Sequence, residues 1–184
     1  MRINIITQPL FWNYGGILQN YALQELLRRM GHQVMTVNVP PGNVAARPDM
    51  RCFAHVMVNM VKKFCGLYDR PYLNPHTLAL KERELSYIQR KFVSEHIVKS
   101  DCFVPFSSET CRKYESDLWI VGSDQVWRPW CSPDIMNYFF DFITDPGIKK
   151  ISYAASFGTD QWEISPEDTP RVKELAQRFN AISV

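Results

Sequence analysis

The sequence predicts an α/β fold in which helices cover both faces of a mainly parallel, doubly wound sheet. Short apolar runs alternate with amphipathic helical patterns, and the chain opens with a strand, a loop, a helix and a second strand. Parallel strands need long crossover connections, which helices usually supply. The chain has 184 residues, of which 46% are hydrophobic. This size suits one domain with a sizeable core.

The opening unit has clear boundaries in the sequence. Isoleucines dominate Arg2–Thr7, which predicts the first strand. A helix is expected over Gly16–Met30, and Gly31 ends it as a C-cap glycine does. Valines in Gln33–Val39 predict the second strand, which Pro40-Pro41 closes.

The middle of the chain is expected to leave the sheet and return to it. Several prolines flank residues at about 40–75, which predicts a peripheral insertion or lid. Leu78–Ile97 reads as an amphipathic helix. Its apolar face is expected to consist of Leu78, Leu85, Ile88 and Phe92.

The second half repeats the strand and helix alternation. A short helix is expected over Ser107–Tyr114, and a helix start is expected with Thr169 as N-cap and Pro170 as the first helical residue. The inner face of this last helix is predicted to hold Val172, Leu175, Ala176 and Phe179. Strands are expected at Leu118–Val121, Asn137–Phe142, Lys150–Ala154 and the final "AISV". A chain that stops inside a strand favours a piece of a longer protein over a strand that simply ends.

Composition argues against several classes of function. The chain has 21 Lys plus Arg and 19 Asp plus Glu, so its net charge of +2 argues against a dedicated nucleic-acid surface. Five cysteines stand at wide spacings with no C-x-x-C pair, which argues against a metal site. No apolar run reaches the length of a membrane span, and "MRINIIT" lacks the features of a signal peptide. The expected location is the cytoplasm.

The first helix carries polar side chains on its predicted inner face. At about 100° per residue, one face of the helix is expected to pack in the core, and it carries Leu23, Leu26, Leu27 and Met30. Extended toward the N-terminus, the same face carries Gly16, Gln19 and Asn20. Buried amides need partners. They either tie down neighbouring loops or form a ligand site, because this end of the helix opens at the carboxyl edge of the sheet. A helix N-terminus also favours an anionic or hydroxyl-rich group.

The stretch "DLWIVGSDQVW" places polar groups directly after a buried strand. Gly122 permits a tight turn or a close backbone approach. Ser123, Asp124 and Gln125 can bond sugar hydroxyls, and Asp124 can serve as a general base. In the alternative interpretation Asp124 only caps backbone amides in an Asx-type turn.

A third polar loop follows a strand in "YAASFG", where Ser156 precedes a glycine. Because three such loops follow strands, we expect Gly15, Gln19, Gly122, Asp124 and Ser156 to surround one crevice at the carboxyl edge. The aromatic residues near these loops can stack on sugars, although such residues more often belong to the core. They are Trp12, Tyr14, Trp127 and Trp130.

Five blocks of the sequence resemble the polysaccharide pyruvyl transferase family in order and spacing. They are "NYGGILQNYAL", "DLWIVGSDQVW", "YFFDFI", "KKISYAASFG" and "FNAISV". The resemblance implies that residues 1–184 form a single Rossmann-like N-terminal domain of a two-domain, glycosyltransferase-B-like enzyme. It also implies a C-terminal domain, absent here, that holds the phosphoenolpyruvate phosphate.

The resemblance implies transfer of a pyruvyl group from phosphoenolpyruvate to sugar hydroxyls, which gives a ketal in a bacterial surface polysaccharide. Asp124 is then the catalytic residue, and this chain alone is expected to be inactive. Arg128 stands where the family often has Asn, and it either helps to hold an anionic donor or faces solvent. The expected substrate-binding residues are Asn13, Tyr14, Gly15, Gly16, Gln19, Gly122, Ser123, Gln125, Trp127, Arg128 and Ser156.

Phosphoenolpyruvate is the donor substrate in this interpretation, and no cofactor or metal is expected. The expected partners are the C-terminal domain and a sugar or lipid-linked oligosaccharide acceptor, which can bring the protein to the inner face of the cytoplasmic membrane. Nucleic acid is not expected. Two alternatives stay open: the acceptor domain of a glycosyltransferase-B-like enzyme that uses a nucleotide sugar, and a non-catalytic glycan-binding fragment.

Overall fold

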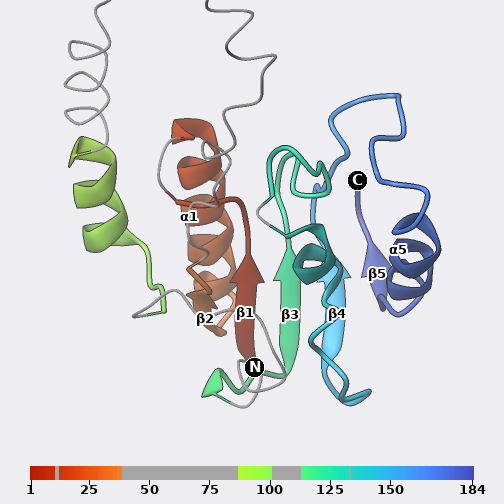
Figure 1. Cartoon of the computed structure of the whole chain (residues 1–184). Coiled ribbons are helices and arrows are strands. Elements are labelled where there is room, and N and C mark those ends of the chain that lie inside the picture. Colours follow the sequence, from red (N-terminus) through yellow and green to blue (C-terminus); the bar gives the residue numbers. More distant parts are fainter. Residues whose placement is uncertain (11–12, 39–86, 101–112, 133) are drawn as a thin grey trace, which may run out of the picture.

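Five parallel strands form one sheet in the order β2-β1-β3-β4-β5 (Figure 1). The structure is a computed structural model that describes residues 1–10, 13–38, 87–100, 113–132 and 134–184. The strands are β1 (Arg2–Ile6), β2 (Gln33–Thr36), β3 (Leu118–Val121), β4 (Lys149–Ser152) and β5 (Ala181–Ile182). The predicted parallel α/β sheet is confirmed.

Helix α1 (Tyr14–Arg29) connects β1 to β2. Its N-cap is Asn13, whose side-chain oxygen accepts a hydrogen bond from the Gly16 amide at 3.1 Å. Its C-terminal end is followed by Gly31 at a φ of +87°, a left-handed conformation that glycine adopts without a steric penalty. The helix therefore begins slightly before its predicted start and ends where Gly31 predicts.

The inner face of α1 differs from the predicted one. Leu23 and Leu27 pack with the isoleucines of β1 and β3, as expected. Leu26 and Met30 are 52% and 62% exposed, so their assignment to the core was wrong. The buried face is rotated because Gln24, which is completely buried, lies inward beside Leu23.

The other face of the sheet is covered by aromatic residues. Trp119 of β3 lies edge-to-face with Phe142 at a centroid distance of 5.2 Å. Two further elements pack on this side: the 3₁₀ helix η1 (Ile135–Phe139) and helix α5 (Thr169–Ala176). Since α1 packs against the opposite face, the predicted doubly wound arrangement is confirmed.

The predicted strand over Asn137–Phe142 is wrong, because η1 occupies this stretch. Asp134 accepts a hydrogen bond from the Met136 amide and so caps the helical turn, and Phe140 adopts a left-handed φ of 57°. The strand β3 is already paired with β1 and β4, so no place for another strand remains beside it. The aromatic run instead packs its rings on the face of the sheet.

Other elements shift by small amounts. Helix α5 has Asp168 as its N-cap, one residue earlier than predicted, and its inner residues Val172 and Leu175 are buried as expected. Residues 87–96 are helical, but Ile88 is exposed, because Val93 and Ile97 pack against α1 in its place. The predicted insertion at 40–75, most of the helix over Ser107–Tyr114 and the first part of Leu78–Ile97 lie outside the described residues. Across the described ranges, no helix is long and apolar enough to cross a membrane.

Candidate functional site

The candidate site lies where the order of the strands reverses. The chain passes from β1 outward to β2 and then returns to the other side of β1 to form β3. In open parallel sheets, ligands bind in the crevice outside the carboxyl ends of the strands at such a switch point. The loops that follow β1 and β3 carry most of the predicted site residues.

Backbone hydrogen bonds hold the "GSDQ" loop between its neighbours. The Gly122 amide donates to the Ile6 carbonyl at 3.0 Å, and the Asp124 amide donates to the Ala154 carbonyl at 3.0 Å. The Ser156 amide in turn donates to the Asp124 carbonyl at 2.9 Å. The loops that follow β3 and β4 are therefore joined directly, and the loop after β3 is also bonded to the end of β1.

Gly122 is required by close backbone packing. Its φ is +133°, and a Cβ atom at this position would lie 2.1 Å from the Tyr153 carbonyl oxygen. No side chain fits at that distance. The approach of the two loops thus depends on a residue without a Cβ atom.

Two side-chain contacts join the β3 loop to the start of α1. The Asn13 side-chain nitrogen donates to Asp124 Oδ2 at 3.2 Å, while the Asn13 oxygen caps the helix. The Ser123 hydroxyl donates to Gln19 Oε1 at 2.8 Å. Four of the predicted residues therefore form two hydrogen-bonded pairs, Asn13 with Asp124 and Ser123 with Gln19. Together they place a carboxylate, two amides and a hydroxyl at one edge of the sheet.

Asp124 has a left-handed backbone, with a φ of 71°, and is half-buried. Its backbone carbonyl accepts from Val126 and Ser156, which closes the turn. Within the described ranges, the hydrogen bond to its carboxylate comes from Asn13 and not from a backbone amide. The turn is thus closed by the main chain, and the side chain lies toward α1.

Arg128 is engaged within its own chain. Its guanidinium makes two hydrogen bonds to the Glu163 carboxylate, at 2.8 and 3.0 Å, and a third to Gln125 Oε1 at 3.1 Å. The hydrogen bond from Arg128 lowers the pKa of Glu163. The ion pair compensates the positive charge and fixes the Gln125 side chain. Arg128 is therefore a poor candidate for holding an anionic donor, the role considered from the sequence.

The aromatic candidates divide into two groups. Trp127 is only 3% exposed, stacks on Phe139 at 5.1 Å, and donates from Nε1 to the Tyr138 carbonyl. This burial corrects its assignment as a substrate-binding residue, because no ring face is left for a sugar. Tyr14 and Trp130 are exposed, and Trp12 lies outside the described residues.

Two buried amides of α1 bond to neighbouring elements, although Asn20 Nδ2 has no partner among the described residues. Asn20 Oδ1 accepts from the Thr36 hydroxyl, and Gln24 donates to Thr36 and to the Val98 carbonyl. Gln24 also accepts from the Val98 amide. Asn20 and Gln24 thus tie the helix to β2 and to residues 98–100, whereas Gln19 alone faces the loop after β3. The role of Gln24 was not predicted from the sequence, although an amide beside the core leucine Leu23 was a usable signal.

The remaining predicted residues belong to the turns themselves. Gly15 lies exposed in the first turn of α1, and Gly16 donates to the N-cap. The Ser156 hydroxyl accepts from the Gly158 amide at 2.8 Å, which stabilises the loop after β4. In the described part of the chain, no three His, Cys, Asp or Glu side chains gather in a way that could hold a metal ion.

The fold and the site define an α/β protein with a polar site at the switch point of a parallel sheet. Residues 13–184 match the polysaccharide pyruvyl transferase family, and the chain belongs to this family. The family is one of transferases, and the resemblance seen in the sequence is thereby confirmed. No curated protein matches the chain in sequence.

Two solved structures are similar to the chain. One is an alpha-glucosyltransferase (AGT) in complex with UDP, with 12% identity and a TM-score of 0.40, covering 98% of this chain and 34% of that one. The other is an alpha-glucosyltransferase in complex with UDP and a 13-mer DNA containing an HMU base, with 13% identity and a TM-score of 0.41. This second match covers 99% of this chain and 37% of the other. The chain thus spans about a third of the length of these glucosyltransferases.

Proposed function

We propose that this chain is the acceptor-binding half of an enzyme that transfers a pyruvyl group from phosphoenolpyruvate to two hydroxyls of a sugar. The observation that carries the proposal is the meeting of Asp124, Asn13, Ser123 and Gln19 at the switch point. These groups suit the recognition of hydroxyls, since a carboxylate accepts from them and amides both donate and accept.

The reaction requires little from the protein beyond positioned acids and bases. Protonation of the enol carbon of phosphoenolpyruvate makes a positively charged carbon centre, which one sugar hydroxyl attacks. Phosphate leaves, and a second hydroxyl attacks to close the ketal. Each attack releases a proton, for which Asp124 is the proposed acceptor. The first of these protons leaves with the phosphate, which frees the carboxylate again, and the second replaces the proton that an acid gave to the enol carbon. The negative charge of Asp124 also stabilises the positive centre.

Asn13 and Gln19 support this arrangement in different ways. The hydrogen bond from Asn13 fixes the orientation of the Asp124 carboxylate, and its capping bond fixes Asn13 itself. The bond between Ser123 and Gln19 holds the other side of the site. Such preorganisation places a base against its substrate without rearrangement during the reaction.

The donor needs positive charge, which the described residues of this edge do not leave available. Arg128 is paired with Glu163, so its charge is compensated within the chain. We therefore propose that a further domain holds the phosphate and carboxylate of phosphoenolpyruvate. Residues 1–184 alone should then release phosphate from phosphoenolpyruvate far more slowly than the whole enzyme does.

Asp124→Asn in the intact protein tests the proposal. The amide keeps the shape of the side chain but cannot accept a proton, and loss of a general base costs roughly 10²–10⁴-fold in rate. Turnover with phosphoenolpyruvate and an acceptor glycan should fall by that factor, with the melting temperature nearly unchanged.

Asp134→Asn is the matched control, because Asp134 also accepts at a turn, but its partner is the Met136 amide of η1 and not a residue of the site. It should leave turnover within about twofold, since Asn caps a helical turn about as well as Asp. Normal turnover of Asp124→Asn with a lowered melting temperature would assign Asp124 to the turn alone.

A further inference from the structure

The loops after β3 and β4 are joined by an ion pair as well as by the main chain. Arg128 and Glu163 lie 35 residues apart, and their two hydrogen bonds form a bidentate contact at 2.8 and 3.0 Å. Their side chains are only 31% and 24% exposed. An arginine that is held at two points and largely shielded from water keeps a defined position. The pair therefore provides a rigid support next to the candidate functional site.

This support determines which end of the Gln125 amide is left for a ligand. A guanidinium only donates, so Arg128 Nη1, at 3.1 Å, bonds to Gln125 Oε1. The Cys131 thiol lies 3.9 Å from the same oxygen and is a second, weaker donor. Burial raises the pKa of this thiol, which therefore keeps its proton at neutral pH. Among the described residues, no hydrogen bond from Gln125 Nε2 is found, so the nitrogen is the end that can meet a ligand.

The loop after β4 packs against the same amide through Gly158. A Cβ atom at this position would lie 2.4 Å from Gln125 Cδ and 2.5 Å from Oε1. Any side chain at residue 158 would displace the amide, and the φ of Gly158 is +69°, which favours glycine. Gln125 is thus held by a guanidinium, a thiol and a glycine backbone.

The Gln125 amide lies beside the Asp124 carboxylate. The two residues are neighbours in the loop, and the negative charge of Asp124 adds to the effect of burial on the pKa of Cys131. The thiol that contacts Gln125 is therefore within electrostatic reach of Asp124. Since Arg128 and Glu163 cancel each other in charge, the net charge of these surroundings is negative. They disfavour an anion and suit a neutral oxygen that carries no proton.

We propose that Arg128 and Glu163 are positioning residues for Gln125, whose amide nitrogen donates a hydrogen bond to the ring or glycosidic oxygen of the acceptor sugar. This inference rests on the proposed function, because the sugar is the acceptor of that reaction. Asp124 then accepts from a hydroxyl, and Gln125 donates to an oxygen without a proton. A site with one acceptor and one donor in fixed places rejects sugars that present the wrong group at either place.

The first test is an NMR titration of the intact protein without phosphoenolpyruvate. The probes are the neutral methyl glycosides of glucose, galactose and mannose, and the signal is that of the Gln125 side-chain amide. This amide should relax as a rigid group, and at least one sugar should shift it saturably. Two analogues of that sugar carry CH₂ in place of either the ring oxygen or the glycosidic oxygen. One of them should bind roughly three- to tenfold more weakly, as expected for one lost hydrogen bond.

Glu163→Gln and Glu115→Gln form a matched pair of variants for the positioning role. Each removes a carboxylate charge that pairs with an arginine, but Glu115 pairs with Arg2 at the amino edge. Glu163→Gln should loosen the Gln125 amide and raise the KM for the acceptor roughly three- to tenfold. Its kcat should stay within about twofold, and its KM for phosphoenolpyruvate should not change. Glu115→Gln should alter none of these quantities, so a selective change in acceptor KM separates positioning from a loss of stability.

Two further variants act on the amide itself. Gln125→Glu keeps an oxygen for Arg128 but replaces the donor nitrogen by a second oxygen, so it should raise the acceptor KM by roughly tenfold. Gly158→Ala displaces the amide and leaves every charge in place, so it should reproduce the effect of Glu163→Gln.

Three results would overturn the inference: a Gln125 amide as mobile in the native protein as in Glu163→Gln, equal effects of Glu163→Gln and Glu115→Gln, or an unchanged acceptor KM in Gln125→Glu. Failure of the proposed function has a different signature, which is normal turnover of Asp124→Asn or no consumption of phosphoenolpyruvate by the intact protein. The titration at Gln125 decides about sugar binding in that case too, because it needs no turnover.

Discussion

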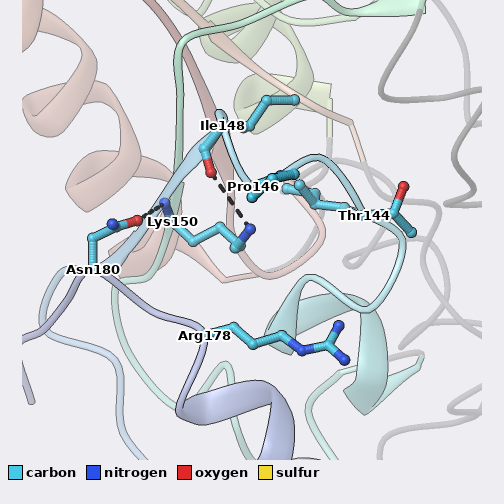
Figure 2. Close-up of a pocket in the computed structure, with 7 residues that line it drawn as sticks. Thr144, Pro146, Ile148, Lys150, Arg178 and Asn180 are labelled. Carbon is cyan, nitrogen blue, oxygen red and sulfur yellow. Dashed lines mark hydrogen bonds between the residues drawn. The ribbon is translucent and has the colours of Figure 1, made fainter.

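The two edges of the sheet hold their loops in different ways. At the carboxyl edge, main-chain hydrogen bonds join the loops after β3 and β4 to each other and to the end of β1, and side chains such as Asn13 and Ser123 add further links. At the amino edge, the loop before β4 and the segment after α5 enclose a cavity whose lining includes Thr144, Lys150 and Arg178 (Figure 2). The first edge is closely packed, and the second encloses space.

The difference indicates where the fold restricts the sequence most. A site that must hold reacting groups in fixed positions benefits from loops that the backbone itself locks together. Residues that line an open space meet fewer neighbouring atoms, so substitutions there cost less. We therefore expect substitutions at the carboxyl edge to cost more stability than matched substitutions at the amino edge.

The largest effect is expected from a pair of glycine substitutions. Gly122→Ala should lower the free energy of unfolding by about 3 kcal/mol or more, because the new methyl group collides with the Tyr153 carbonyl at a positive φ. Gly147→Ala at the amino edge meets only the flexible Asp145 side chain, at 3.1 Å, and should change stability by about 0.5 kcal/mol at most. Urea unfolding of both variants measures the difference, and equal losses would contradict the comparison.

A smaller effect is expected from removing one hydroxyl at each edge. Ser123→Ala deletes the bond to Gln19 and should cost about 1 kcal/mol or less, because the pair is exposed. Thr144→Val deletes a hydroxyl for which no partner is found among the described residues, and should change stability by less than about 0.5 kcal/mol. Thermal unfolding at the same pH compares the two. A larger loss for Thr144→Val would show that the cavity wall is more tightly held than its contacts indicate.

The smallest effects concern two carboxyl groups whose pKa values shift in opposite directions. The hydrogen bond from Arg128 lowers the pKa of Glu163, so this residue stabilises the fold above its ordinary pKa and loses that effect as the pH falls. Burial raises the pKa of Asp141, so its charged form at neutral pH disfavours the fold. Glu163 lies at the carboxyl edge, and Asp141 precedes the cavity loop.

Two variants test these opposite signs. At pH 7, Glu163→Gln should be less stable than the native protein, while Asp141→Asn should be more stable by less than about 1 kcal/mol, since water screens a half-buried charge. The Asp141 difference should vanish once the pH falls below the ordinary pKa of an aspartate, while the Glu163 difference should vanish only at a lower pH, below the lowered pKa of Glu163. Urea midpoints measured across this pH range check the prediction. Differences of equal sign at pH 7 would contradict it.

Patterns that depend on local geometry predicted most of the fold. The periodicity of Arg2–Thr7 and Leu118–Val121 indicated parallel strands, and Gly31 marked the end of α1. The strand predicted from the aromatic run after Asn137 is wrong, because a buried strand and a segment packed flat on a sheet have the same composition. Only the pairing of β3 with both neighbours decides between them.

The sequence predicted which loops form the candidate site, but not all the contacts of their side chains. The approach of Asp124 to Asn13 follows from the rule that parallel strands end at one edge. The sequence left open whether Trp127 lies in the core or faces a sugar. The pairing of Arg128 with Glu163 did not follow, because it depends on a contact between residues far apart in the chain. Sequence spacing carries no information about such contacts.

The order of the strands also has a consequence for how the chain refolds. Ile3 of β1 pairs with Val34 on one side and with Leu118 on the other, and the second pairing closes a loop several times longer than the first. Contacts between distant residues cost more chain entropy and form more slowly. We therefore expect the β1–α1–β2 unit to gain its helical signal early in refolding. Fluorescence from the buried Trp119 and Trp127 should change later, when β3 joins the sheet and the loops after β1 and β3 first meet.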